Sequence, residues 1–127
     1  MTFSKWVFRI AGVWGLLVVP PFYFMEEAVG RMAPPPITHP EFYFGFLGIT
    51  LAWQLAFLVI GTDPVRYRAL ILPSIVEKFG YVVALAVLYS QGRVSPSALP
   101  LGTVDLLLGT LFVLSFLKTA PARRAPA

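Results

Sequence analysis

Four long runs of apolar residues alternate with short polar segments along this chain, and each run could cross a membrane as a helix. A bilayer core about 30 Å thick needs roughly 20 apolar residues per helix. The runs cover residues 6–25, 42–60, 69–89 and 99–117. Lipid offers no hydrogen bonds to a backbone, so such runs span it as helices. We therefore predict an all-α fold, an integral membrane four-helix bundle forming a single domain over residues 1–127.

The segments between the runs are rich in residues that end helices. Residues 26–41 contain Pro34, Pro35, Pro36 and Pro40, a density that rules out a continuing helix. The linkers 61–64 and 90–92 have turn composition, and the Ala-, Pro- and Arg-rich tail 119–127 is predicted to be disordered.

A secretory signal is the competing interpretation of the first run. Lys5 and Arg9 precede its apolar stretch, as they would in a signal peptide. The stretch is long for a signal, however, and it ends in Glu26 and Glu27 instead of a small-residue cleavage site. We therefore expect a membrane span.

The amino-acid composition limits the class of protein and the kinds of functional site that are possible. Mean hydropathy is +0.77 and 13% of residues are charged, against roughly 25% in soluble domains. The chain has no cysteine, which excludes disulfides and thiolate metal sites. His39 is the single histidine, and nucleotide-binding and Ser-His-Asp motifs are absent. We expect no metal, no cofactor and no nucleic-acid partner; the catalytic residues, if any, remain unknown.

Basic residues predict the orientation. Seven lie on one side of the predicted membrane, where the N-terminus, the second loop and the tail meet: Lys5, Arg9, Arg66, Arg68, Lys118, Arg123 and Arg124. The other side has Arg31 and Arg93. Because basic loops stay in the cytoplasm, both termini should be cytoplasmic. We also expect a bacterial inner membrane more than the endoplasmic reticulum.

Charged residues inside two of the runs are the main functional candidates. Glu77 and Lys78 lie in the third run and Asp105 in the fourth. At 1.5 Å per residue they lie about 13–19 Å deep, and Gln54 of the second run lies about 10 Å deep. An ionisable group at such depth is costly, so it normally faces a partner or a cavity.

Helical spacing places these groups on faces that could meet. Steps of three and four from Glu77 reach Ser74, Gly80 and Tyr81, a small and polar stripe typical of helix contacts or cavity walls. Around Asp105 the same steps reach Gly102 and Gly109, where another backbone can approach.

Two interpretations of these groups stay open. In the first, Lys78 pairs with Asp105, and Glu77 with Gln54, Tyr81 or Ser74, to hold the bundle together. Adjacent Glu77 and Lys78 point about 100° apart, so they are not expected to pair with each other. In the second, the groups line a cavity that binds an amine, a sterol-like lipid or a proton.

A resemblance adds one expectation. The segment Gly12-Val-Trp-Gly-Leu-Leu-Val-Val-Pro-Pro-Phe-Tyr-Phe-Met-Glu-Glu resembles the first helix of the EXPERA family, which includes the sigma-2 receptor and the emopamil-binding sterol isomerase. The chain looks equally like small bacterial DoxX-like proteins with four helices. The EXPERA resemblance implies that Glu26 corresponds to the acidic residue with which the family's first helix ends. It likewise implies that Gln54 corresponds to the glutamine of the family's second helix. Thr50 stands where that family has an acid, which argues against sterol isomerisation.

We therefore expect a small membrane protein that binds a lipophilic or amine/sterol-like ligand in a central polar cavity. The candidate ligand-binding residues are Glu26, Gln54, Glu77, Lys78, Tyr81 and Asp105. The alternatives are a non-catalytic subunit of a larger membrane complex, a homodimer included, and a membrane-embedded isomerase or proton-coupled carrier. A cavity binder should have a void beside Glu77 and Asp105, whereas a structural subunit should have them paired and sealed.

Overall fold

Four long helices form the body of the molecule. The computed structural model describes residues 2–121, and within that range it contains helices and no strand. The elements are α1 (Thr2–Val18), the 3₁₀ turn η1 (Pro20–Phe24), α2 (Glu26–Met32), α3 (Pro40–Thr62), α4 (Arg68–Ser90), the 3₁₀ turn η2 (Pro96–Ala98) and α5 (Leu99–Lys118). Four segments are long and apolar enough to cross a membrane: Thr2–Phe24, Pro40–Thr62, Arg68–Ser90 and Pro96–Lys118. The predicted all-α membrane bundle is confirmed.

The element boundaries differ from the predicted ones in two places. Three spans begin and end one to three residues outside the predicted limits, because polar residues at helix ends continue the backbone hydrogen-bond pattern beyond the apolar run. The first span begins four residues early, at Thr2, and ends at Phe24, just inside its limit; Pro20 and Pro21 end its α-helix at Val18 and leave the rest as η1. The short helix α2 was not predicted. It forms because Glu26 and Glu27 occupy its first turn and Arg31 its last, which suits the helix dipole, and because the prolines begin only after it ends. All but the first residues of the predicted disordered tail lie outside the described range.

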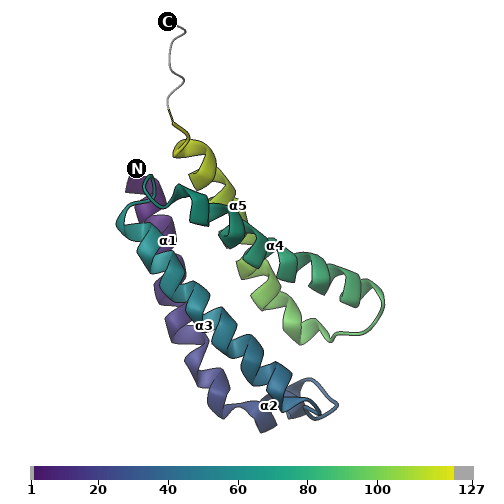
Figure 1. Cartoon of the computed structure of the whole chain (residues 1–127). Coiled ribbons are helices and arrows are strands. Elements are labelled where there is room, and N and C mark those ends of the chain that lie inside the picture. Colours follow the sequence, from purple (N-terminus) through teal and green to yellow (C-terminus); the bar gives the residue numbers. More distant parts are fainter. Residues whose placement is uncertain (1, 122–127) are drawn as a thin grey trace, which may run out of the picture.

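The helices associate as two pairs. α1 packs along α3, and α4 packs along α5, whereas α3 and α4 contact each other far less. Figure 1 shows that the pairs lie close together where the chain begins and where α5 ends, and diverge toward the opposite end. We call the first of these the terminal end and the second, which holds α2 and residues 91–95, the distal end. The bundle is therefore V-shaped.

Aromatic side chains close the terminal half of the V. Phe8 of α1 stacks on Phe112 of α5 with ring centroids 4.4 Å apart, and Phe57 of α3 meets Phe112 edge-on at 5.0 Å. These three rings, with Ile60 and Ile71, have no exposed surface. Because residues from all four long helices take part, this aromatic cluster joins the two pairs.

Glycines allow close approach within each pair, as predicted around Asp105. A side chain at Gly102 would meet Leu85, and one at Gly109 would lie 3.0 Å from the ring of Phe79. In the other pair, the Gln54 side chain lies directly on Gly15, where a Cβ atom would overlap it. Small residues are what membrane helices use to pack closely.

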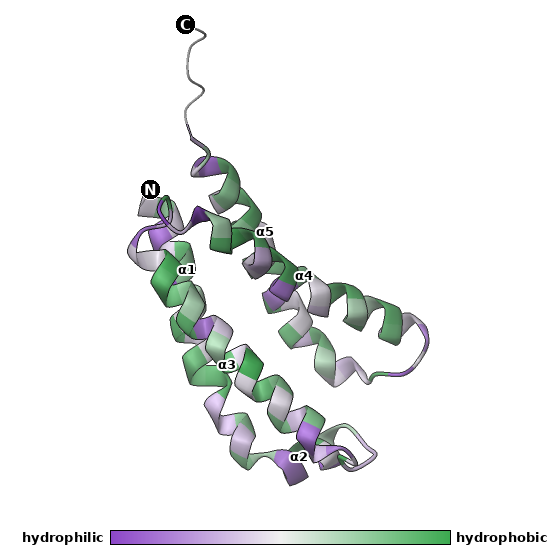
Figure 2. Cartoon of the chain, viewed as in Figure 1, coloured by the Kyte–Doolittle hydropathy of each residue, from purple (hydrophilic) through white to green (hydrophobic). Residues whose placement is uncertain are grey.

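The outer surface of the long helices is apolar. Figure 2 shows hydrophobic residues along most of each long helix, with polar residues near the helix ends and near the middle of the α4–α5 pair. Large side chains such as Leu17 and Val83 are 71% and 60% exposed. A contiguous apolar exterior of this kind matches a bilayer, which is as apolar as the side chains themselves.

Candidate functional cavity

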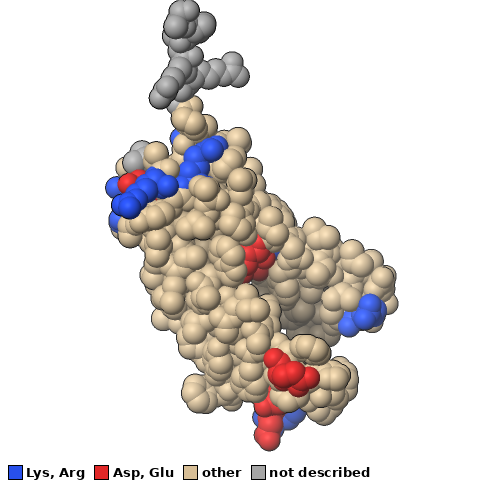
Figure 3. Space-filling model, viewed as in Figure 1, with Lys and Arg blue, Asp and Glu red and all other residues tan. Residues whose placement is uncertain are grey.

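The divergence of the two helix pairs leaves a cavity of about 730 Å³ between them. It lies beyond the aromatic cluster, in the distal half of α3 and beside the middle of α4. Figure 3 shows a hollow between the two lobes, with acidic side chains where the lobes separate. The structure places five of the predicted residues around this cavity: Gln54, Glu77, Lys78, Tyr81 and Asp105.

Lys78 is the centre of a three-residue charge cluster. Its ammonium nitrogen lies 3.2 Å from Oδ1 of Asp105, to which it donates a hydrogen bond, and 3.4 Å from Oε2 of Glu77. The Lys78–Asp105 pair was predicted and is confirmed. The expectation that Glu77 and Lys78 do not pair was wrong, because the flexible lysine stem lets the ammonium bridge back to the neighbouring carboxylate even though the two Cα–Cβ bonds diverge.

Two of the other predicted partners of Glu77, Gln54 and Ser74, form hydrogen bonds elsewhere. The amide nitrogen of Gln54 donates to the Thr50 carbonyl at 2.9 Å, and the Ser74 hydroxyl donates to the Leu70 carbonyl at 2.7 Å. Oε2 of Glu77 is buried, and within the described residues no group donates a hydrogen bond to it. The expected bonds from Gln54, Tyr81 and Ser74 to Glu77 are therefore not formed. Polar side chains on a helix can satisfy themselves on their own backbone one turn earlier.

The cluster carries an excess of negative charge when all three groups are ionised. Glu77 and Asp105 contribute two negative charges and Lys78 one positive, a net of −1. Their side chains are 17%, 21% and 6% exposed, so the charges are only weakly hydrated. The Lys78 nitrogen also lies 5.2 Å from the centre of the Phe57 ring, above the aromatic cluster. Such a site can attract a cation from the cavity.

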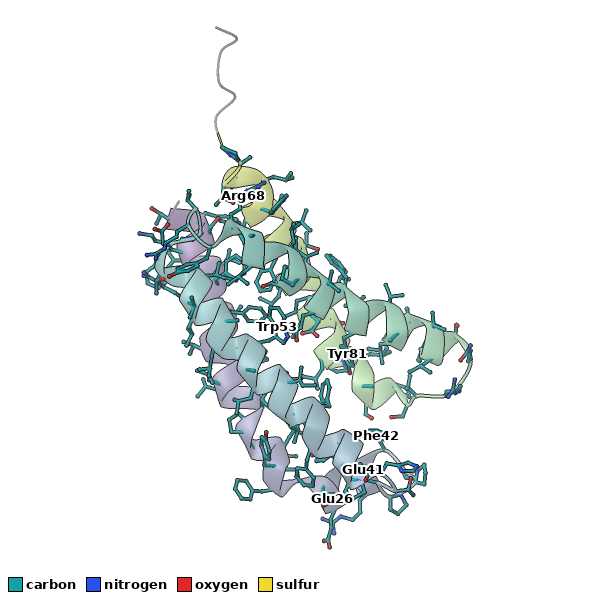
Figure 4. All side chains as sticks on the ribbon, in the orientation of Figure 1. Glu26, Glu41, Phe42, Trp53, Arg68 and Tyr81 are labelled. Carbon is teal, nitrogen blue, oxygen red and sulfur yellow. The ribbon has the colours of Figure 1, made fainter. Side chains whose placement is uncertain are left out.

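Aromatic and aliphatic side chains make up the rest of the wall. Trp14 and Trp53 both line the cavity. Figure 4 shows Trp53 between the two helix pairs and Tyr81 beside α4 and α5, and both residues line the cavity. Val18, Val19 and Phe22 of the first span also line it and were not predicted. No sequence signal could have found them, because the whole span is apolar and its inward face is set only by packing.

Glu26 lies apart from this cavity. It borders a separate hollow of about 400 Å³ at the distal end, together with Glu27 and Arg31. Figure 4 shows it at the distal end with Glu41, whose carboxylate is 3.4 Å from the His39 ring. The resemblance that singled out Glu26 and Gln54 together is thus not matched by a shared cavity. In residues 2–121 no three potential ligands of the His, Cys, Asp or Glu type gather to hold a metal.

Comparison with known proteins adds nothing to this geometry. No family model, no curated protein and no solved structure matches the chain.

Proposed function

We propose that this membrane protein is a receptor that binds a small lipophilic amine in its central cavity. The amine would carry a sterol-like or other apolar body. The cavity volume of about 730 Å³ falls within the roughly 300–1,000 Å³ of drug-sized binding sites. Its walls are mainly aromatic and aliphatic, and a few polar groups converge on one place. Both properties are typical of sites that bind small molecules.

The observation that carries the proposal is the state of Glu77. Oε2 of its carboxylate is buried and accepts no hydrogen bond from the described residues, although the Lys78 nitrogen lies 3.4 Å away, and the cluster has one cation for two anions. A buried carboxylate oxygen that accepts no hydrogen bond is costly. A protonated amine would supply the missing positive charge and an N–H donor together, and charge-assisted hydrogen bonds are the stronger kind. A carboxylic or phosphate ligand would instead add to the negative excess.

The test is thermal unfolding of the purified protein in detergent with and without lipophilic amines. A ligand present at 100 times its dissociation constant stabilises the folded state by about 2.7 kcal/mol. Wild type should therefore show a rise in Tm with a cationic amphiphile and a smaller one with the neutral alcohol of the same shape. Glu77→Gln should keep or gain stability without ligand and should lose the response to the amine.

Glu27→Gln serves as the control, because Glu27 is exposed and lies outside the cavity. This variant should respond to the amine as wild type does. If no lipophilic amine or sterol stabilises wild type and Glu77→Gln is simply less stable, the cavity does not bind such ligands. The subunit interpretation would then replace the receptor interpretation.

One observation favours that second function. The Lys78–Asp105 pair joins α4 to α5, as expected of polar groups that hold a structural subunit together. Such a subunit would fill the gap between its helix pairs with a partner helix. The amine titration separates the two functions. A receptor should be stabilised by the amine without any partner helix, whereas a structural subunit should be stabilised only by its partner.

The placement of charge supports the predicted orientation. Within the described residues Lys5, Arg9, Arg66, Arg68 and Lys118 gather at the terminal end. Arg31 and Arg93 lie at the distal end. On this basis we propose that the terminal end is cytoplasmic and the cavity opens in the opposite leaflet. A bacterial inner membrane stays a prediction. Membership of the EXPERA or DoxX-like families stays a prediction.

A further inference from the structure

The terminal end of the bundle carries a strong positive charge that the fold itself does not neutralise. Within residues 2–121, five basic residues and one acid, Asp63, lie there, a net of +4. At the distal end, two arginines face three glutamates, a net of −1. Figure 3 shows the basic side chains gathered where α1 begins and α5 ends.

None of these five cations is held by a carboxylate. Over the part of the chain that the structure describes, ion pairs involve His39, Glu41, Glu77, Lys78 and Asp105 and no residue of the terminal end. The Asp63 carboxylate instead accepts a hydrogen bond from the backbone nitrogen of Arg66 at 3.1 Å. The terminal end is therefore open to an anionic partner.

Two of the arginines form hydrogen bonds to carbonyl groups at helix ends. The Arg9 side chain donates to the Gly61 carbonyl at 3.1 Å, near the end of α3. Arg68 donates twice to the Phe116 carbonyl, at 3.2 and 3.0 Å, near the end of α5. Both bonds satisfy carbonyl groups that lack a partner within their own helix. These arginines remain charged, but their positions are fixed by the helix ends.

Within the described residues, the side chains of Lys5 and Arg66 donate no hydrogen bond of this kind. The Lys5 backbone lies against Gly61, so Lys5 and Arg9 border the end of α3 from which the loop carrying Arg66 emerges. Arg66 is exposed, and its guanidinium lies 5.3 Å from the ring of Tyr67. Trp6, 56% exposed, lies between Lys5 and Arg9 in sequence. Aromatic rings beside exposed cations are typical of the level of lipid headgroups.

We infer that this basic surface, formed by Lys5, Arg9 and Arg66, binds the phosphodiester headgroups of anionic phospholipids. The four membrane-spanning helices place the end of α3 at a bilayer surface, so a lipid phosphate is the anion within reach at high local concentration. Basic residues near an anionic leaflet each strengthen binding about fivefold. The inference does not depend on what the central cavity binds.

The experiment uses the full chain in a neutral detergent, titrated with short-chain phosphatidylglycerol or with phosphatidylcholine of the same acyl length. Binding is followed by thermal unfolding. Wild type should be stabilised more by phosphatidylglycerol, and the difference should shrink as salt is raised. The double variant Lys5→Gln/Arg66→Gln should bind phosphatidylglycerol about 25-fold more weakly, by the fivefold effect per residue.

A matched control removes the same charge at the other end. Arg31→Gln/Arg93→Gln lowers the net charge equally but should change phosphatidylglycerol binding less than twofold. Inorganic phosphate at the same concentration should not stabilise wild type. The inference is overturned if both lipids stabilise equally, if the distal variant loses as much affinity, or if inorganic phosphate alone reproduces the effect.

Discussion

Replacing different members of the charge cluster beside the cavity should destabilise the protein by different amounts. Lys78 lies between two carboxylates, at 3.2 Å from Asp105 and 3.4 Å from Glu77. Replacing the lysine leaves two carboxylates facing each other without a cation. Replacing Asp105 leaves Glu77 and Lys78 as a neutral pair. The two single changes therefore should not cost the same.

The magnitudes follow from burial. Removing one partner of a buried ion pair costs about 3–5 kcal/mol. Because Glu77 and Asp105 are 17% and 21% exposed, partial hydration should hold Lys78→Met near the lower limit, at about 3 kcal/mol. Asp105→Asn loses one hydrogen bond but keeps the second carboxylate, so about 1 kcal/mol is expected.

The double variant tests whether the groups interact. With both changes, Glu77 alone remains charged, and the repulsion between the two carboxylates is absent. The double variant should therefore be more stable than Lys78→Met alone, with a coupling energy of about 1–2 kcal/mol. The expected order of stability is wild type, Asp105→Asn, the double variant, and Lys78→Met.

Equilibrium unfolding in mixed detergent micelles measures these differences. The chain has three tryptophans, and two of them, Trp14 and Trp53, line the cavity and can report its loss by fluorescence. Glu41→Gln is the control, because the His39–Glu41 contact is exposed and such pairs contribute at most about 1 kcal/mol. Equal losses from the two single changes, or strict additivity in the double variant, would refute this account of the cluster.

Two further predictions concern topology and packing. Reporter fusions at Ala127 and near Pro35 should read opposite sides of the membrane, with Ala127 in the cytoplasm; an external reading at Ala127 would reverse the proposed orientation. Gly15→Ala should destabilise the protein by about 1–3 kcal/mol in the same unfolding assay, because a Cβ there overlaps Gln54. The control Gly45→Ala, which meets nothing within 4 Å, should be neutral or slightly stabilising, and an equal loss at both glycines would show that the contact is unimportant.

The sequence predicts the helices well because the bilayer simplifies the problem. Apolar length alone locates a span, so the four membrane helices were found within a few residues. α2 was missed because proline density was read over the whole segment 26–41, whereas the prolines occupy only its second part. Charged residues within a span predicted the lining of the cavity equally well, since Glu77, Lys78 and Asp105 all border it.

The details of the cluster could not be predicted in the same way. Helical wheel geometry gives the direction of a Cα–Cβ bond, but not where a four-carbon lysine stem places its ammonium, so the Glu77–Lys78 contact was missed. Nor does an apolar span reveal which of its faces packs inward. The cavity residues of the first span depend on how the two helix pairs diverge beyond the aromatic cluster, which is a property of their packing and not of any local sequence pattern.

The association of neighbouring helices into two pairs has a consequence for how the protein is made. α1 and α3 belong to the first half of the chain and α4 and α5 to the second, and residues 63–67 connect them. The first pair can therefore insert and pack as a helical hairpin as it leaves the ribosome, before the second pair has been synthesised. The cavity belongs to neither hairpin. Its amide and most of its aromatic wall come from the first, and all three charges come from the second. Under the proposed function, mutations that alter the preferred shape of the ligand and mutations that alter its preferred charge would thus fall in separate halves of the chain.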